Sequence, residues 1–94
     1  MDEDGYKIIK DLTDDVKKVT EKIYGFPSQV NIVSAKLLLG PDGWGGKSYY
    51  FMIKYEVDGV GCEELKPVYA NLADVVDDVL LSIVSSYERT HIIQ

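Results

Sequence analysis

A glycine-rich stretch near the middle of the chain has the residue types of a phosphate-binding loop. Residues 40–48 read GPDGWGGKS, ending in Gly46, Lys47 and Ser48. A nucleotide-binding P-loop also needs a glycine five positions before the Gly-Lys pair, and a helix directly after it. Pro41 occupies the glycine position, and the alternating segment SYYFMIKYEV follows. We therefore interpret the stretch as a link between two strands that does not bind nucleotide.

Trp44 lies at the tip of this link and has two possible roles. We expect it to fold back over a sheet edge and cap the core. The alternative is a partner-binding side chain, because tryptophan is enriched in binding hot spots and loops often carry function.

Groups for catalysis or metal binding are few. Cys62 is the only thiol and His91 the only histidine. A Cys-His dyad would require the C-terminal tail to lie beside the strand that holds Cys62, with a third group orienting the histidine. One cysteine and one histidine are too few for a tetrahedral zinc site. The sequence therefore predicts a protein that is not an enzyme and has no metal and no cofactor.

Carboxylates are the most abundant polar groups. The chain has 16 acidic and 10 basic residues, giving a net charge of -6. Such a charge repels nucleic acid and anionic membranes and favours a basic partner protein. Neighbours such as Asp77 and Asp78 do not share a face of a helix or strand, so they are not acid/base pairs. We expect a partner-binding surface that comprises Asp58, Glu63, Glu64, Asp74, Asp77, Asp78, Leu81 and Trp44.

The charge distribution favours a non-enzymatic acidic protein-binding module. One version is a DNA mimic, an inhibitor whose carboxylates replace phosphates in the basic site of a nucleic-acid-binding protein. Phage anti-restriction and anti-defence proteins of similar size and charge provide the analogy. The alternative is a small structural or assembly subunit, a possible homodimer, that associates through apolar residues. Its candidate contacts are Tyr50, Met52, Ile92 and Ile93.

Hydrophobic spacing predicts the elements that position these residues. Apolar residues at three- and four-residue steps indicate a helix over residues 6–24, ended by Gly25 and Pro27. Residues 29–39 and 48–57 have strand patterns, and Asp58-Gly59 predicts a tight hairpin. A third strand over residues 60–65 should end at Pro67.

A second helix is expected from Leu72, with Asn71 as its N-cap and Asp74 as the reciprocal acid. Residues 88–94 could extend this helix or form a short strand. The 94 residues are sufficient for one domain, residues 1–94. The predicted fold is α+β, a two-layer sandwich with the order helix, three-stranded antiparallel sheet, helix.

This predicted order resembles that of double-stranded-RNA-binding domains. Those domains place basic residues at the start of the second helix, where this chain has NLADVVDD. No RNA-binding residue is therefore carried across. The acidic start and the lack of a long apolar run predict no signal peptide and no membrane span, and hence a cytoplasmic protein.

Overall fold

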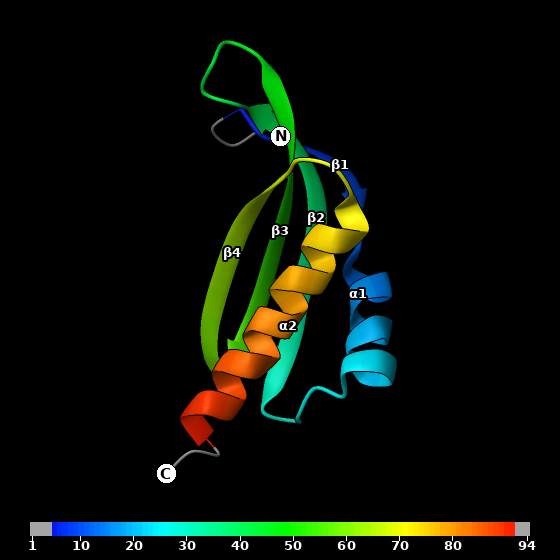
Figure 1. The fold of residues 1–94 in the computed structure, drawn as a ribbon, viewed down its shortest axis with the longest axis vertical. Coiled ribbons are helices and arrows are strands. Elements are labelled where there is room, and N and C mark those ends of the chain that lie inside the picture. The colour runs from blue at the N-terminus through cyan, green and yellow to red at the C-terminus, as the bar shows by residue number, and fades with distance from the viewer. Residues whose placement is uncertain (1–4, 92–94) are drawn as a thin grey trace.

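The computed structural model describes residues 5–91, which form a four-stranded antiparallel sheet and a helical layer (Figure 1). The elements in chain order are β1 (Lys7–Asp11), α1 (Thr13–Val19), the π-helical turn η1 (Thr20–Tyr24), β2 (Val30–Pro41), β3 (Lys47–Val57), β4 (Val60–Val68) and α2 (Leu72–His91). The strands lie in the order β1-β2-β3-β4. The α+β class is confirmed, whereas the predicted number of strands and the first helix need correction.

The strands β2, β3 and β4 form the predicted antiparallel meander. β3 alternates as expected: Phe51 and Ile53 are fully buried on the helix side, whereas Tyr50 and Met52 lie on the opposite face. Asp58 and Gly59 both have positive φ, 53° and 81°, and Val57 pairs with Val60. This is the two-residue turn that an Asp-Gly pair favours.

Pro67 does not end the third strand of the meander, contrary to the sequence prediction. β4 continues to Val68, and Pro67 pairs with Tyr50. β4 lies at the edge of the sheet, so one side of its backbone has no ladder partner among the described residues. An edge strand accepts a proline for this reason.

The first part of the predicted N-terminal helix is instead a strand. Residues 7–11 form β1, which pairs with Lys36–Leu39 of β2 and contains an irregularity between Ile8 and Lys10. The exposed edge of β2 supplies backbone partners, and this pairing overrides the helical spacing of the apolar residues. The element order is therefore β-α-β-β-β-α, which removes the resemblance to double-stranded-RNA-binding domains.

Asp11 and Thr13 organise the change from strand to helix. The Asp11 carboxylate accepts hydrogen bonds from the Thr13 backbone N–H (3.0 Å) and hydroxyl (2.6 Å). These bonds are the main reason that the pKa of Asp11 is lowered. The Leu12 N–H donates to the Ala35 carbonyl (2.8 Å), which ties the start of α1 to β2.

The last turn before Gly25 is π-helical, and this changes which side chains face the core. Ile23 belongs to the apolar residues whose spacing predicted the helix over residues 6–24, yet it is 73% exposed, whereas Tyr24 is half-buried against the core. A π turn closes with bonds of wider spacing than an α turn and so rotates the following residues. Gly25 ends the turn in the left-handed conformation, with φ 60°.

α2 begins and continues as predicted. The Asn71 side chain accepts the Ala73 N–H (2.8 Å), and the helix extends through residue 91, so the first residues of the tail are helical. Val79, Leu80 and Ile83 are buried in the core. Ile92 and Ile93 lie outside the described residues.

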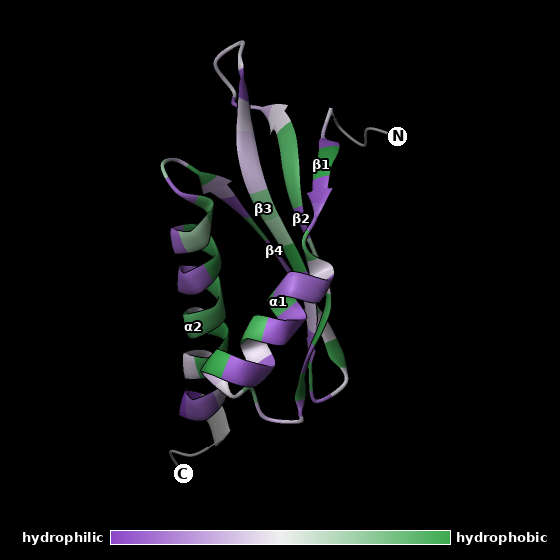
Figure 2. Ribbon diagram, turned by 90° about the vertical axis from the view of Figure 1, so that its right-hand side faces the viewer, coloured by the Kyte–Doolittle hydropathy of each residue, from purple (hydrophilic) through white to green (hydrophobic). Residues whose placement is uncertain are grey.

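Within residues 5–91, α1 and α2 both pack on one face of the sheet, which leaves the opposite face without a helix from this part of the chain (Figures 1 and 2). The register places an apolar group on the uncovered face, comprising Ile8, Leu38, Tyr50, Met52, Leu65 and Pro67. Tyr6 stacks edge-on against Tyr50, with ring centroids 5.4 Å apart, and the Tyr6 ring lies directly against Gly40. No helix within residues 5–91 is both long and apolar enough to cross a membrane.

Candidate protein-binding interface

A groove separates the α1–η1 segment from α2. Its volume is about 540 Å³, and its lining is mostly apolar. The apolar residues are Leu12, Val16, Val19, Leu72, Ala73 and Val76, and the polar ones are Asp15, Tyr24, Asp74 and Asp77. No lysine, arginine or histidine lines the groove among the described residues. The groove is therefore an apolar depression bordered by three carboxylates.

Local structure explains how these side chains meet. The Asn71 cap fixes the first turn of α2, which places Leu72 and Val76 four residues apart on one face. On the other wall, Leu12 and Val16 are buried at the same spacing. The π turn then directs Tyr24 toward α2. The sequence predicted the start of α2, whereas the role of Tyr24 depends on a π turn that no local sequence pattern indicates.

A hydrogen bond joins the two walls. The Tyr24 hydroxyl donates to Oδ1 of Asp77. This bond, followed by desolvation and the nearby negative charge, raises the pKa of Tyr24 to about 12. The Tyr24 ring also makes an edge contact with Phe26, with centroids 6.4 Å apart. Asp77 is therefore held in place as an acceptor at the side of the groove.

We predict that the protein loses stability at alkaline pH through Tyr24. The pKa of Tyr24 is about 12 in the folded state and 10.0 in the reference state, so folding favours the protonated hydroxyl. The contribution is complete below pH 10.0 and is lost as the pH rises toward about 12. Denaturant unfolding measures the free energy of unfolding between these pH values. Over this range it should decline less for Tyr24→Phe than for the unmodified protein. An identical decline in both proteins would contradict the assignment.

Tyr55 provides the matched comparison for this titration. Its hydroxyl donates to Oε2 of Glu64 (3.0 Å), and burial, followed by that bond, raises its pKa. Tyr55→Phe should therefore also flatten the alkaline decline. The double variant with Tyr24→Phe should flatten it most.

The structure divides the predicted contact residues among several places. Asp74 and Asp77 line the groove, together with Asp15, which the sequence analysis did not select. Glu64 and Asp78 line a second hollow between β4 and α2, which also contains Lys66. Glu63 is exposed on the face without helices, where it is the cross-strand neighbour of Lys54 in the β3–β4 ladder.

The remaining predicted residues lie apart from the groove. Asp58 belongs to the β3–β4 turn, and Leu81 on α2 is 44% exposed. The eight predicted residues therefore do not form one continuous surface. In the sequence Asp15 stands out only as half of the Asp14-Asp15 pair, whose charge Lys17 and Lys18 balance. Its place at the groove depends on the two helices lying side by side.

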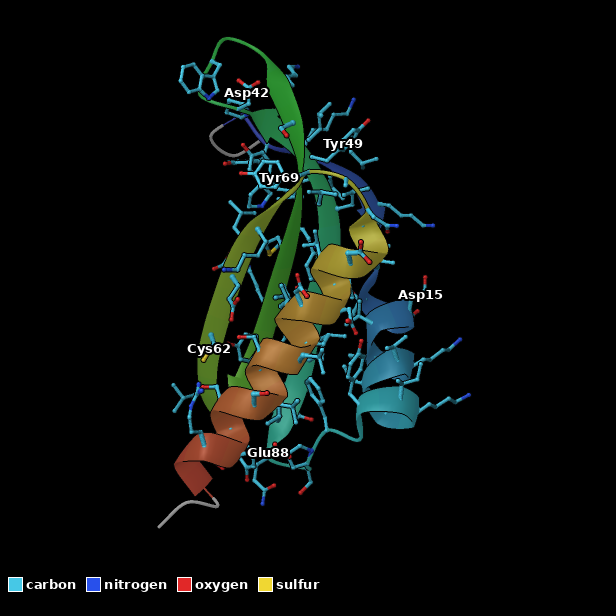
Figure 3. The ribbon with its side chains drawn as sticks, in the orientation of Figure 1. Asp15, Asp42, Tyr49, Cys62, Tyr69 and Glu88 are labelled. Atoms are coloured by element: carbon cyan, nitrogen blue, oxygen red, sulfur yellow. The ribbon has the colours of Figure 1, made fainter. Side chains whose placement is uncertain are left out.

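Trp44 does not cap the core, which corrects the preferred sequence interpretation. Its side chain is 92% exposed at the end of the β2–β3 hairpin. Oδ1 of Asp42 accepts the N–H groups of Trp44 (2.7 Å) and Gly46 (3.1 Å), which orders the loop. Figure 3 shows Asp42 at the same end of the molecule as Tyr49 and Tyr69. The alternative role, a partner contact, stays a prediction.

The groups that could perform other chemistry lie elsewhere. Cys62 is half-buried in β4, and its thiol donates to the Val60 carbonyl oxygen at 3.8 Å (Figure 3). The side chain of His91 is not among those described. Within residues 5–91, no three or more His, Cys, Asp or Glu side chains are grouped so that they could hold a metal ion.

Comparisons with protein-family models, with curated proteins and with solved structures find no match, so the arrangement of the groove itself is the basis for inferring function.

Proposed function

We propose that this protein is a non-enzymatic binding module that takes a basic segment of another protein on its helical side. The observation that carries the proposal is the groove, where Asp15, Asp74 and Asp77 border an apolar floor. Carboxylates at the edge of an apolar depression attract lysine and arginine while the floor contributes contact area. The net charge of -6 adds long-range attraction for a basic partner.

A nucleic-acid-mimicking inhibitor is a narrower form of this proposal. Asp74, Asp77 and Asp78 lie on α2, and Glu64 borders the adjacent hollow with Asp78. These four carboxylates are the ones that a nucleic-acid-binding partner would meet together. Glu63 lies on the face without helices and Asp58 lies in the β3–β4 turn, so the mimic would use this smaller set.

A second candidate is assembly through self-association. The apolar group on the face without helices supports it, because Ile8 and Leu65 are exposed there. Exposed apolar patches often mark contact sites. Here the two exposed residues lie on opposite edge strands, with Tyr50, Met52 and Pro67 half-buried between them. Sedimentation of the full chain separates the candidates. A stable oligomer that Leu65→Lys dissociates would favour assembly, whereas a monomer that binds basic peptides would favour the first proposal.

Salt dependence and charge neutralisation test the main proposal. The probe is a fluorescent peptide of about 12 residues with the repeat Lys-Ala-Ala-Lys, near the shortest length at which isolated helices form. Its affinity should fall severalfold between about 20 and about 200 mM salt, because salt screens exposed charges. Anisotropy gives the dissociation constant. Binding that is indifferent to salt would rule the proposal out.

A matched pair of triple variants locates the charge effect. The groove variant carries Asp15→Asn, Asp74→Asn and Asp77→Asn. The control has the same net charge and carries Asp14→Asn, Glu21→Gln and Glu88→Gln, all at exposed positions that do not line the groove. The groove variant should bind the peptide about tenfold more weakly than the control, roughly the effect of a few partly exposed ion pairs. An equal loss of peptide affinity in both variants would show that the attraction does not come from the groove carboxylates in particular.

A further inference from the structure

We infer that the groove between α1–η1 and α2 binds an amphipathic basic helix, with apolar side chains on its floor and lysines or arginines at Asp15, Asp74 and Asp77. This inference rests on the function proposed above and specifies the partner. A basic segment alone would use the carboxylates, whereas an amphipathic helix would also use the apolar floor.

The floor is firmly supported by the core. Leu12 and Val16 are buried, and Val19, Leu72 and Val76 are half-buried and pack against the core. A groove that is formed from anchored aliphatic side chains does not need to be rebuilt when a ligand enters. This is the type of surface that accepts the apolar face of a helix.

The spacing of the carboxylates favours a helical ligand. Asp74 and Asp77 are three residues apart on α2, so at about 1.5 Å of rise per residue they lie about 4.5 Å apart along it. Lysines at positions i and i+3 of a partner helix have the same separation along their helix. Residues on one side of an extended strand recur at about 6.6 Å. A helix lying along α2 therefore matches the acids more closely than a strand does.

Asp15 extends the charge to the opposite wall. It projects from α1, so basic residues on either side of a partner's apolar face have an acidic partner. This arrangement suits a helix whose apolar stripe is flanked by lysines on both edges, which is the usual pattern of a basic amphipathic helix. An anionic helix or nucleic acid would meet like charge at every border of the groove.

Tyr24 gives Asp77 a defined position within this arrangement. Its hydroxyl donates to one carboxylate oxygen, and a carboxylate has capacity for further donors. A lysine ammonium can therefore bind Asp77 while the Tyr24 bond persists. The half-buried Tyr24 ring also contributes apolar area at the η1 end of the groove.

The test compares two peptides of equal charge and length. One has the repeat Lys-Leu-Leu-Lys, and the other is the Lys-Ala-Ala-Lys peptide, each of about 12 residues. The leucine peptide should bind about tenfold more tightly, or better, because leucine side chains leave water when they enter the groove. Far-ultraviolet circular dichroism should also show added helix in the mixture relative to the sum of its components.

A filled groove should abolish the preference for leucine. Ala73 is exposed and lines the groove, so Ala73→Phe occupies the space without changing the charge. We expect the leucine peptide to bind about tenfold more weakly and the alanine peptide to change less than about twofold. Ser85→Phe is the matched control, an exposed position on the same helix that does not line the groove. Ala73→Leu replaces Ala73→Phe if thermal unfolding shows that the larger ring impairs folding.

The outcomes distinguish this inference from the proposal on which it rests. If both peptides bind equally and with salt dependence, the binding function stands and the amphipathic partner is wrong. If neither peptide binds, both ideas fail. Two further results would overturn the inference. One is equally tight binding of a scrambled leucine peptide that has no apolar face. The other is an Ala73→Phe variant that binds the leucine peptide as tightly as Ser85→Phe does.

Discussion

Replacing Leu80 by alanine should lower the free energy of unfolding by about 2–5 kcal/mol, the usual cost of removing a buried leucine side chain. Leu80 is completely buried in the core between α2 and the sheet. The loss combines the apolar area returned to water with the cavity that remains. Because domains are stable by only about 5–15 kcal/mol, this single change removes a large share of the total. Chemical denaturation followed by circular dichroism measures it.

Leu81→Ala is the matched control for Leu80→Ala, because it removes the same atoms from the next residue of the same helix. Leu81 is 44% exposed, so its replacement should cost less than about 1 kcal/mol. Equal losses at the two positions would contradict the placement of α2. Leu81→Ala also keeps the fold intact for binding assays, where the role of Leu81 as a contact residue can be measured directly.

Gly40→Ala should destabilise the protein even though alanine normally suits a strand better than glycine. A β-carbon at Gly40 would overlap the Tyr6 ring, which lies directly against the backbone there. The ring must move and would disturb its edge contact with Tyr50. Forcing extra volume into such a contact typically costs about 1–3 kcal/mol.

The same substitution should change sign when Tyr6 is removed. In a Tyr6→Ala background the three atoms nearest to a β-carbon at Gly40 are removed, so Gly40→Ala should be neutral or stabilising by up to about 1 kcal/mol. A double-mutant cycle from denaturant unfolding gives the coupling energy. A penalty that persists without Tyr6 would mean that the backbone at residue 40, rather than the ring, excludes a side chain.

The sequence was informative wherever the structure depends on local patterns. The alternation in SYYFMIKYEV predicted the strand β3, and Asp58-Gly59 located the hairpin. Asn71 marked the start of α2. Each of these features depends on a few neighbouring residues. Those residue types strongly favour the backbone conformation or the hydrogen bond that the feature requires.

The N-terminal region was mispredicted because distant parts of the chain decide its conformation. Residues 7–11 fit a helical stripe, yet the open edge of β2 recruits them as β1. Ile23 fits the same stripe, yet the π turn directs it to solvent and brings Tyr24 inward. No pattern within residues 6–24 indicates either event.

The candidate site was only partly predictable for the same reason. Asp74 and Asp77 stood out through an excess of acidic charge, but the groove also needs Asp15 and Tyr24 from a segment some 50 residues earlier. Charge counting finds residues near one another in sequence. It cannot indicate that Glu64 borders a hollow with Asp78 while its neighbour Glu63 lies on the other face of the sheet.

The exposure of Trp44 determines what fluorescence can report about this protein. Trp44 is the only tryptophan, and its indole is already 92% exposed to water in the folded state. Unfolding leaves that indole in water, so its emission maximum is a poor measure of the folding transition. The same property makes it a selective reporter of the hairpin tip: a blue shift on mixing with a partner would arise from contact at Trp44, with little background from the rest of the chain.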